Sequence, residues 1–402
     1  MLAVTYNERM SKLSIKDLDL KDKTVFIRVD FNVPLAAGGQ EITSDKRIRA
    51  SLPTIQYALE HNAGVILASH LGRPKGKPNP EMSLAPVAAR LGELLGKPVT
   101  MAPDSVGPEV AALRPKPGEV LLLENLRFHP EEEANDAEFS RQLASLADVY
   151  VNDAFGSAHR AHASTVGIIA YMPQAAAGLL MDRELEWLSK AIKHPDRPCI
   201  ALLGGAKVSD KIEVIQNLIT IVDKLLIGGA MAYTFLRARN ESTGKSLVEE
   251  DRIELARQLL ATAGPKLVLP IDHIVVREVK AAAPHEAVST IGDGMIAVDI
   301  GPKTIEEYSR IISGAKTIIW NGPMGIFEMP PFDTGTVELA KAVANSGAVS
   351  VVGGGDSEKA IKSAGVSDKI THISTGGGAS LEFLGGIELP GVAALTDKSG
   401  GS

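Results

Sequence analysis

Six polar or charged side chains follow the predicted strands in the first half of the chain, at the point where each strand ends. They are Asp30, Asn32, His70, Arg73, Arg127 and Arg160. The carboxyl ends of parallel strands meet at one edge of a sheet, where ligands bind. The planar fork of arginine suits phosphate or carboxylate, whereas an amide and an acceptor suit hydroxyl groups. The set therefore predicts a site for a small, doubly anionic, hydroxylated ligand.

Each of these arginines, taken singly, could instead be a solvated surface residue or an ion-pair partner. Their shared position at strand ends favours a site. Arg28 lies inside a predicted strand and could serve the structure alone. We expect the acidic run Glu131-Glu132-Glu133 to be the solvated start of a helix.

A glycine-rich turn in the second half predicts a phosphate site. The apolar run 200–203 predicts a strand, and Gly204-Gly205-Ala206-Lys207-Val208-Ser209-Asp210-Lys211 follows and predicts the start of a helix. Such a turn exposes backbone N–H groups, and the helix dipole favours an anion there. Lys207 and Lys211 are four residues apart, so we expect them on one helix face, where like charges repel by roughly 0.2–0.5 kcal/mol. A bound anion would reverse that cost; two solvated lysines are the alternative.

Two more glycine clusters follow strands, Gly353-Gly354-Gly355-Asp356-Ser357 and Gly376-Gly377-Gly378-Ala379. Asp356 could supply an oxygen ligand for Mg²⁺. The amides of Gly376 and Gly377 could face a transferring phosphoryl group. Glycine runs also form ordinary turns, so it is the recurrence of three clusters that favours a nucleotide site.

Several other enzyme classes lack their motifs here. Gly244-Lys245-Ser246 is not a Walker A motif, because Arg239 stands where its first glycine is required. No clean G-x-G-x-x-G follows the first strand, which disfavours a nicotinamide-dependent oxidoreductase. Zinc-ligand spacing, H-E-x-x-H, a nucleophile elbow and the protein-kinase catalytic loop are also missing from the sequence.

Apolar runs alternate with helical patterns along the whole chain, which predicts parallel sheets buried on both faces. The predicted strands are 25–29, 65–68, 120–123 and 149–151, then 200–203, 224–227, 267–269, 317–320 and 349–352. Two such series in 402 residues predict two α/β domains. We place them at 1–181 and 195–385, joined by 182–194 with a helix over 182–193. The tail 386–402 is expected to be extended.

Composition predicts a soluble globular protein, with 45% apolar and 23% charged residues. A formal charge of −7 favours neither nucleic acid nor an anionic membrane as a partner. Cys199 is the only cysteine, so no intrachain disulfide forms. No 20-residue apolar span occurs, and the first residues are too polar for a signal peptide. We therefore expect a cytoplasmic location.

Together these motifs resemble the phosphoglycerate kinase family over nearly the whole chain. The strings are RVDFNVP (28–34), ASHLGRP (68–74), LLENLRF (122–128), NDAFGSAHRAHAS (152–164), LLGGAKVSDK (202–211), WNGPMGIFE (320–328), GGGDS (353–357) and STGGGASLE (374–382). Their order also matches that of the family. Ser357 stands where many members have threonine, which keeps the hydroxyl. Residues 1–9 precede the usual family start near Met10.

The resemblance implies two Rossmann-like domains with parallel sheets flanked by helices, facing across a hinged cleft, with the C-terminal tail packing back on the first. It implies reversible transfer of the acyl phosphoryl group of 1,3-bisphosphoglycerate to MgADP. The implied 3-phosphoglycerate site is Asp30, Phe31, Asn32, Arg47, His70, Leu71, Gly72, Arg73, Arg127 and Arg160. The implied nucleotide site is Gly205, Lys207, Lys211, Asn321, Glu328, Gly354, Gly355, Asp356 and Ser357, with Asp356 near Mg²⁺.

By the same resemblance, the charge of the moving phosphoryl group is neutralised by Arg47, Lys207, Lys211, Mg²⁺ and the amides of Gly376 and Gly377. Domain closure would bring the two substrates in line. A monomer without nucleic-acid or membrane partners is expected. A non-catalytic scaffold on the same fold is the alternative, although such a module would not need both half-sites.

Overall fold

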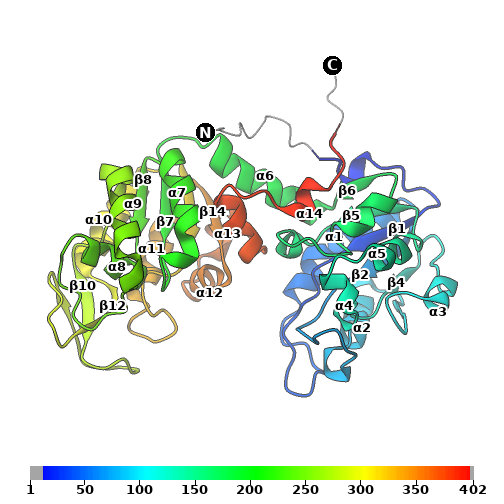
Figure 1. The fold of residues 1–402 in the computed structure, drawn as a ribbon, viewed down its shortest axis with the longest axis horizontal. Helices are drawn as coiled ribbons and strands as arrows, with labels where there is room; N and C mark the ends of the chain where they lie inside the picture. The colour runs from blue at the N-terminus through cyan, green and yellow to red at the C-terminus, as the bar shows by residue number, and fades with distance from the viewer. Residues whose placement is uncertain (1–11, 399–402) are drawn as a thin grey trace. The chain divides into compact units, whose positions relative to one another are not determined.

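The computed structural model describes residues 12–398, which divide into two compact units (Figure 1). Unit 1 comprises the residues up to Leu185 and those from Glu388 onward, and unit 2 is Glu186–Ile387. Helix α6, Leu179–Lys193, contributes residues to both units and begins three residues before the predicted helix. Residues 1–9, which precede the usual family start, lie outside the described part of the chain.

Unit 1 is built on a six-stranded parallel sheet in the order β3-β4-β2-β1-β5-β6. Its strands are β1 Thr24–Arg28, β2 Gly64–Ala68, β3 Thr100–Met101, β4 Val120–Leu122, β5 Val149–Asn152 and β6 Ala175–Ala177. Every residue of β1 and β2 is buried. This burial follows from their central position and from helices on both faces, which is why these strands are near-continuous apolar runs in the sequence.

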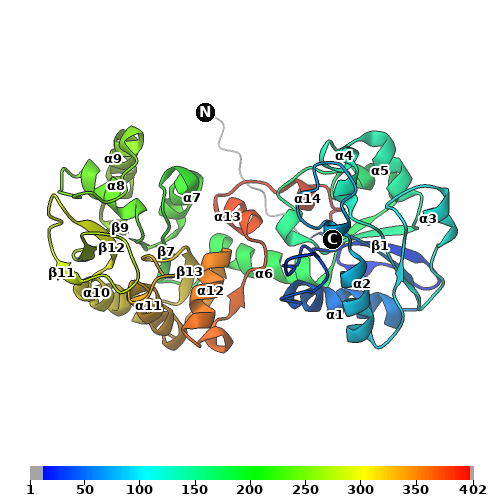
Figure 2. The ribbon, with the colours of Figure 1, turned by 90° about the horizontal axis from the view of Figure 1, so that it is seen from below.

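Helices cover both faces of this sheet (Figure 2). On one face lie α1, Lys46–Glu60, and α2, Ala85–Leu95; on the other lie α4, Pro130–Glu133, and α5, Ala137–Ala144. Helices α3, Pro108–Ala112, and α14, Pro390–Ala393, also belong to this unit; α14 lies in the tail 386–402, which was expected to be extended. The C-terminal segment is tied to unit 1 by the amides of Gly391 and Thr396, which donate to the carbonyls of Ala158 at 2.8 Å and Ala175 at 2.9 Å.

Unit 2 contains a second six-stranded parallel sheet, in the order β15-β14-β13-β7-β8-β9. Its strands are β7 Cys199–Leu203, β8 Lys224–Ile227, β9 Leu267–Val268, β13 Thr317–Asn321, β14 Val349–Gly353 and β15 His372–Ile373. Its helices are α7 Ile212–Ile221, α8 Met231–Ala238, α9 Ile253–Ala263, α10 Pro302–Ser313, α11 Thr334–Asn345, α12 Gly355–Ser363 and α13 Gly378–Leu384. Helices α8 and α9 lie on one face of the sheet and α10 and α11 on the other (Figure 2). The predicted class, two parallel sheets flanked by helices, is confirmed.

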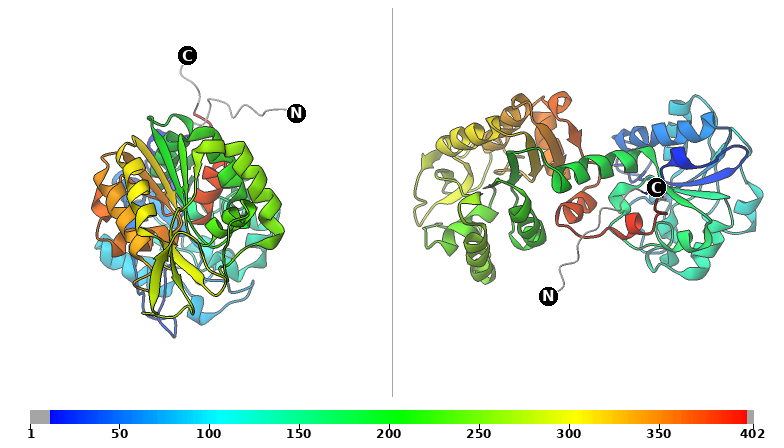
Figure 3. Two further views of the ribbon diagram at one scale, coloured as in Figure 1. Left: turned by 90° about the vertical axis from the view of Figure 1, so that its left-hand side faces the viewer. Right: turned by 90° about the horizontal axis from the view of Figure 1, so that it is seen from above.

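A small antiparallel sheet in unit 2 was not predicted. It has the order β11-β10-β12 and comprises β10 His273–Val276, β11 His285–Val288 and β12 Ile296–Ile300. The three strands lie nearest the viewer in the left panel of Figure 3. Strand β11 is mostly exposed and reads His-Glu-Ala-Val, so it lacks the apolar run by which the buried strands are recognised.

No helix within residues 12–398 combines the length and the apolar character needed to cross a membrane.

Candidate functional site

The strand order β4-β2-β1-β5 brings the carboxyl-end residues of unit 1 to one edge of the sheet. There, Arg47 Nη1 donates to Asp30 Oδ1 at 2.9 Å and to the carbonyl of Asn32 at 3.0 Å. Asn32 Oδ1 accepts from the amide of Gly72 at 2.9 Å. The carbonyl of Gly72 accepts from Arg127 Nη1 at 3.1 Å. Hydrogen bonds therefore join the loops after β1, β2 and β4 into one rim.

Asn125 organises this rim, and sequence reasoning missed it. Its Oδ1 accepts from the amides of Leu71 at 3.2 Å and Arg127 at 3.1 Å. Its Nδ2 donates to the carbonyls of Leu71 at 2.8 Å and Met82 at 2.9 Å. A fully buried amide with all of these partners holds the loop of Gly72 against the turn of Arg127. A polar residue two positions after the predicted strand 120–123 and two positions before Arg127 was the available signal.

The predicted substrate residues differ in what they can offer a ligand. Arg73 and Arg160 are exposed, and Arg47 is half-exposed, so their guanidinium groups can meet an anion from solvent. Phe31 and Leu71 are buried in the core of the unit, so their side chains face away from solvent. At these two positions contact with a ligand is restricted to the backbone.

His70 and Arg28 are buried beneath the rim. Arg28 Nη2 lies 3.2 Å from His70 Nδ1, and Arg28 is 1% exposed. Burial, together with the charges of Arg28, Arg127 and Arg47, holds the pKa of His70 well below its usual value, so the imidazole is neutral. The expectation for the acidic run is wrong at its middle member. Glu132 is fully buried in α4 because Ser164 donates two hydrogen bonds to its carboxylate.

In unit 2 the turn after β7 departs from the prediction at Lys207. The helix does not run through residues 207–211: Lys207 lies in an exposed loop, a 3₁₀ turn covers Ser209–Lys211, and α7 begins at Ile212. Glu249 sets this geometry, because its carboxylate accepts from the amides of Val208 and Ser209. Those donors are thereby used by a residue 40 positions away, for which the local sequence carries no signal. Lys207 and Lys211 therefore do not share a helix face.

Lys211, in contrast, is held in a polar cluster at the ends of β13 and β14. Its Nζ donates to Asn321 Oδ1, and Asn321 Nδ2 donates to the carbonyl of Gly353 at 2.9 Å. Gly354 follows with φ +93°, where a Cβ would lie 3.0 Å from Asn321 Nδ2, so glycine is required. Ser357 Oγ, fully buried, accepts from the amide of Gly322 at 2.6 Å. Burial lowers the pKa of Lys211 to about 8, against the opposing effect of Asp210 and Asp356.

The remaining predicted nucleotide residues flank this cluster. Asp356 is exposed in the first turn of α12, and its Oδ1 accepts from Lys359 Nζ at 3.1 Å. Glu328 is exposed in the turn between β13 and α11. Gly377, with φ +51°, caps α13, and the amide of Gly376 donates to Ser374 Oγ at 3.1 Å. An anion at Gly376 would therefore have to displace the hydroxyl of Ser374 from this amide. The amide of Gly205 is also occupied, because it donates to the carbonyl of Pro323 at 3.1 Å.

Comparison with known proteins identifies the family. The model for the family described as phosphoglycerate kinase matches residues 15–387, which is most of the chain. The chain belongs to the phosphoglycerate kinase family. It is 72% identical over 389 residues to a phosphoglycerate kinase of Solibacter usitatus, covering 96% of this chain and 100% of that protein. It is 60% identical over 396 residues to that of Moorella thermoacetica, covering 97% and 100%.

Solved phosphoglycerate kinase structures have the same fold. The structure from Coxiella burnetii matches with a TM-score of 0.88 at 42% identity, covering 95% of this chain and 98% of that one. The structure from Pyrococcus horikoshii matches with a TM-score of 0.83 at 36% identity, with the same coverage of both chains. The two parallel sheets are thus those of a phosphoglycerate kinase.

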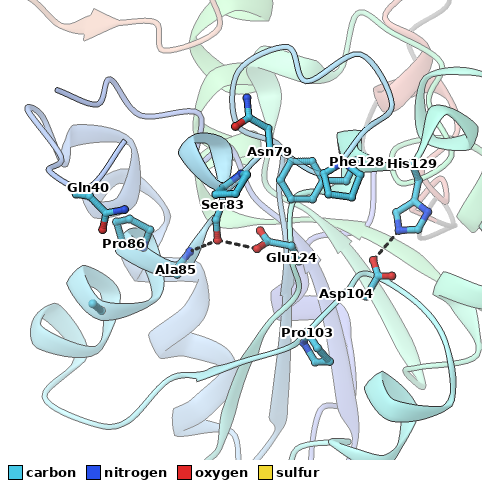
Figure 4. A pocket seen from close by; sticks show the side chains of 13 residues that line it. Gln40, Asn79, Ser83, Ala85, Pro86, Pro103, Asp104, Glu124, Phe128 and His129 are labelled. Carbon is cyan, nitrogen blue, oxygen red and sulfur yellow. Dashed lines mark hydrogen bonds and ion pairs between the residues drawn. The ribbon is translucent and has the colours of Figure 1, made fainter. Parts of the chain in front are cut away.

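One pocket in each unit is lined by sequence neighbours of the predicted site residues, but by none of those residues themselves. A pocket of about 380 Å³ in unit 2 is lined by residues that flank Lys211 and Gly377, including Asp210, Ile212 and Gly378. A larger pocket of about 870 Å³ in unit 1 (Figure 4) is lined by none of the residues predicted from the sequence. Its acidic side chains are already paired: Glu124 accepts from Ser83 Oγ at 2.6 Å, and Asp104 lies 2.6 Å from His129 Nε2.

Proposed function

We propose that this protein catalyses the reversible transfer of the acyl phosphoryl group of 1,3-bisphosphoglycerate to MgADP, giving 3-phosphoglycerate and MgATP. The observation that carries the proposal is the presence of both half-sites in one family member. Unit 1 holds a cationic rim around Asp30, Arg47 and Arg127. Unit 2 holds Lys211 against Asn321, beside the turns of Gly205 and Gly354. A binding scaffold would not need both.

Unit 1 is assigned the three-carbon substrate. Exposed Arg73 and Arg160, with Arg127, suit the non-reacting 3-phosphate, because each presents a planar fork of donors. Asp30, Asn32 and His70 suit the hydroxyl and carboxyl end. The backbone at Phe31, Leu71 and Gly72 shapes the same rim. We accordingly assign residues 1–181 and the tail 386–402 to this domain.

Unit 2 is assigned the nucleotide. Lys207, Lys211 and the amides at Gly376 and Gly377 suit the phosphates, and Glu328 suits the ribose. The rest of the set lies in the turn after β7, at the end of β13 and around the start of α12: Gly205, Asn321, Gly354, Gly355, Asp356 and Ser357. We accordingly assign residues 195–385 to this domain, with 182–194 as the connection.

Mg²⁺ fits the proposed nucleotide site as a metal ion whose ligands come mostly from phosphate oxygens and water, with few from the protein. Within residues 12–398 no group of three or more acidic, histidine or cysteine side chains could hold a metal ion. Mg²⁺ commonly takes one or two carboxylates and completes its shell with water and phosphate oxygens. The exposed carboxylate of Asp356, at the start of α12, would hold it. When bound, Mg²⁺ supplies positive charge to the phosphate oxygens.

The transfer itself needs no general base. In the direction of ATP formation, a β-phosphate oxygen of ADP attacks the acyl phosphorus, and the bond from that phosphorus to the carboxyl oxygen breaks. The leaving group is a carboxylate, and in reverse the attacking carboxylate is already ionised at neutral pH. Catalysis therefore rests on positioning and on neutralising charge, which we assign to Arg47, Lys207 and Lys211.

Transfer also requires the two bound substrates to be brought together, because the half-sites belong to different units. We propose that the domains close about the 182–194 connection when both substrates bind. Small-angle scattering should give a smaller radius of gyration with both substrates than with either alone, and an unchanged radius would count against closure. We further propose that the protein is a cytoplasmic monomer, as membership of the family implies.

The test of the reaction is an assay with ATP, Mg²⁺ and 3-phosphoglycerate, in which glyceraldehyde-3-phosphate dehydrogenase and NADH report 1,3-bisphosphoglycerate. We expect turnover in the wild type and a loss of about 10²–10³ in kcat for Lys211→Ala. Lys316→Ala removes an exposed lysine of the same unit and serves as the control. A folded wild type without turnover would overturn the proposed reaction.

A further inference from the structure

Glu132 is a fully buried carboxylate in a run of three glutamates. It lies in α4 at 0% exposure, whereas its neighbours Glu131 and Glu133 are exposed. The amide of Ser164 donates to its Oε2 at 2.9 Å, and Ser164 Oγ donates to its Oε1 at 2.6 Å. The carbonyl of Glu132 accepts from the amide of Ala163 at 2.9 Å. Carboxylates are rarely buried this far unless they are paired, so the arrangement points to a partner of opposite charge.

His162 Nδ1 lies 3.8 Å from Glu132 Oε1, but burial lowers the pKa of His162 to about 4, so this imidazole is neutral. The partner of opposite charge is Arg28, which Glu132 reaches through Ser164. Arg28 Nε donates to Ser164 Oγ at 2.8 Å. The hydroxyl oxygen is therefore an acceptor for Arg28, while its proton is donated to Glu132 Oε1. Within residues 12–398 no carboxylate lies within 4 Å of the Arg28 guanidinium, so its charge is compensated across this hydroxyl. Burial raises the pKa of Glu132, and the charge of Arg28 offsets part of that rise.

Arg28 in turn determines which nitrogen of His70 carries the proton. Its Nη2 lies 3.2 Å from His70 Nδ1, and a guanidinium can only donate. Nδ1 must therefore accept, and the proton of the neutral ring resides on Nε2. His70 thus offers an N–H donor at the edge of the sheet where the substrate rim lies.

We propose that Glu132 is a positioning residue for the three-carbon substrate: through Ser164 and Arg28 it holds His70 in the Nε2–H tautomer that donates to that ligand. The proposal rests on the proposed function of the unit 1 rim. Glu132 itself does not touch the substrate. Its contribution is to keep the guanidinium oriented. Arg28 Nη1 donates to the carbonyl of Val29, and without the Glu132 carboxylate the Ser164 hydroxyl, which is the acceptor of Nε, is free to turn its proton elsewhere.

Four variants test the chain of contacts. Glu132→Gln keeps the shape but replaces one acceptor with an amide donor that faces Ser164, and Ser164→Ala removes the connecting hydroxyl. Ser164→Thr retains the hydroxyl and should therefore keep the wild-type Michaelis constants and the wild-type His70 spectrum. Glu131→Gln, an exposed neighbour on the same helix, is the matched control. Each is measured for kcat, for the Michaelis constants of both substrates, for thermal stability, and for the ¹⁵N shifts of His70, assigned by comparison with His70→Gln.

We expect Glu132→Gln and Ser164→Ala to raise the Michaelis constant for the three-carbon substrate about tenfold and to leave that for ATP within twofold. The His70 spectrum should change from a single Nε2–H tautomer to a mixture. Folded variants with wild-type Michaelis constants and the wild-type His70 spectrum would overturn the proposal, even if their melting temperature falls. Should Glu132→Gln fail to fold, the comparison of Ser164→Ala with Ser164→Thr decides. A wild type without turnover would overturn the proposed reaction, whereas the His70 spectra would still test the role of Glu132.

Discussion

The ammonium of Lys211 donates a hydrogen bond to Oδ1 of Asn321, the last residue of β13. Asn321 is itself fixed, because its Nδ2 donates to the carbonyl of Gly353 at 2.9 Å. The lysine is therefore held at the strand end by an amide whose orientation is set by the neighbouring strand. A neutral amide does not compensate the charge, which leaves the ammonium available to phosphate and sensitive to burial.

This pairing predicts a basic limb in the pH dependence of activity. The pKa of Lys211 is lowered to about 8 by burial, so above that pH the free enzyme loses the positive charge to which we assign phosphate binding. We expect kcat/KM for MgATP to fall about tenfold per pH unit above pH 8, since this parameter reports the free enzyme. Lys211→Arg, which stays protonated, should move the limb to higher pH. A limb that persists unchanged in Lys211→Arg would belong to another group.

Arg47 should matter more to the rate than its neighbour on the same helix. Arg47 Nη1 is held by Asp30 at 2.9 Å, whereas Arg49 pairs with Asp45 on the exposed side of α1. We expect Arg47→Ala to lower kcat about 10²–10³, because we propose that the guanidinium neutralises charge on the transferring group. Arg49→Ala should stay within twofold, as expected for a surface pair. The coupled assay checks both, and equal losses in the two variants would remove Arg47 from the charge-stabilising role.

Asp272 should be among the stabilising residues of unit 2. Its buried carboxylate accepts from the amides of Lys303 at 3.0 Å and Thr304 at 2.8 Å, and from Thr304 Oγ1 at 2.7 Å. It thereby caps α10 from outside the helix. We expect Asp272→Ala to lower the free energy of unfolding by about 2–4 kcal/mol, since buried donors lose their acceptor. Asp293→Ala, at an exposed position, should change it by about 0.5 kcal/mol or less. Urea denaturation measures the two, and similar values would refute the capping role.

His273 should make the protein sensitive to acid. It is 3% exposed, and burial lowers its pKa to about 4. The folded pKa lies below the unfolded value of roughly 6.5, so the stability contribution is complete above pH 6.5 and is lost as pH falls toward 4. At pH 4.5 the loss is about 2–3 kcal/mol.

The substitution His273→Phe should remove that part of the acid sensitivity. The ring keeps its edge contact with Tyr233, whose centroid lies 5.7 Å away, and cannot be protonated. Urea denaturation at pH 7 and 4.5 should therefore show a smaller difference than in the wild type. His194→Phe, at an exposed position, is the control. If His273→Phe and the wild type lose the same stability between the two pH values, another group is responsible.

Nine of the twelve parallel strands within residues 12–398 were predicted from the sequence, because their signal is a local apolar run; β3, β6 and β15, with only two or three residues each, were missed. The residues of β1 and β2 are all buried, so each reads as an apolar run with no polar face. The polar residues that follow these runs were predicted to gather at one edge, and the order β4-β2-β1-β5 places them there. The antiparallel strand β11 was missed for the converse reason, since it is short and exposed.

By itself, the sequence determined the family, the two parallel sheets and the types of residue at their carboxyl ends, because these depend on short strings and on local periodicity. Tertiary structure alone decided the state of individual charges. Glu132 is buried rather than solvated because Ser164, 32 residues away in the sequence, donates a hydrogen bond to its carboxylate. Arg28, 136 residues from Ser164, donates to the same hydroxyl. Lys207 leaves the helix because Glu249, from another segment, accepts from the two amides that follow. Hydrogen bonds between segments so distant in sequence form only when the chain packs, and no local pattern records which charge they will bury.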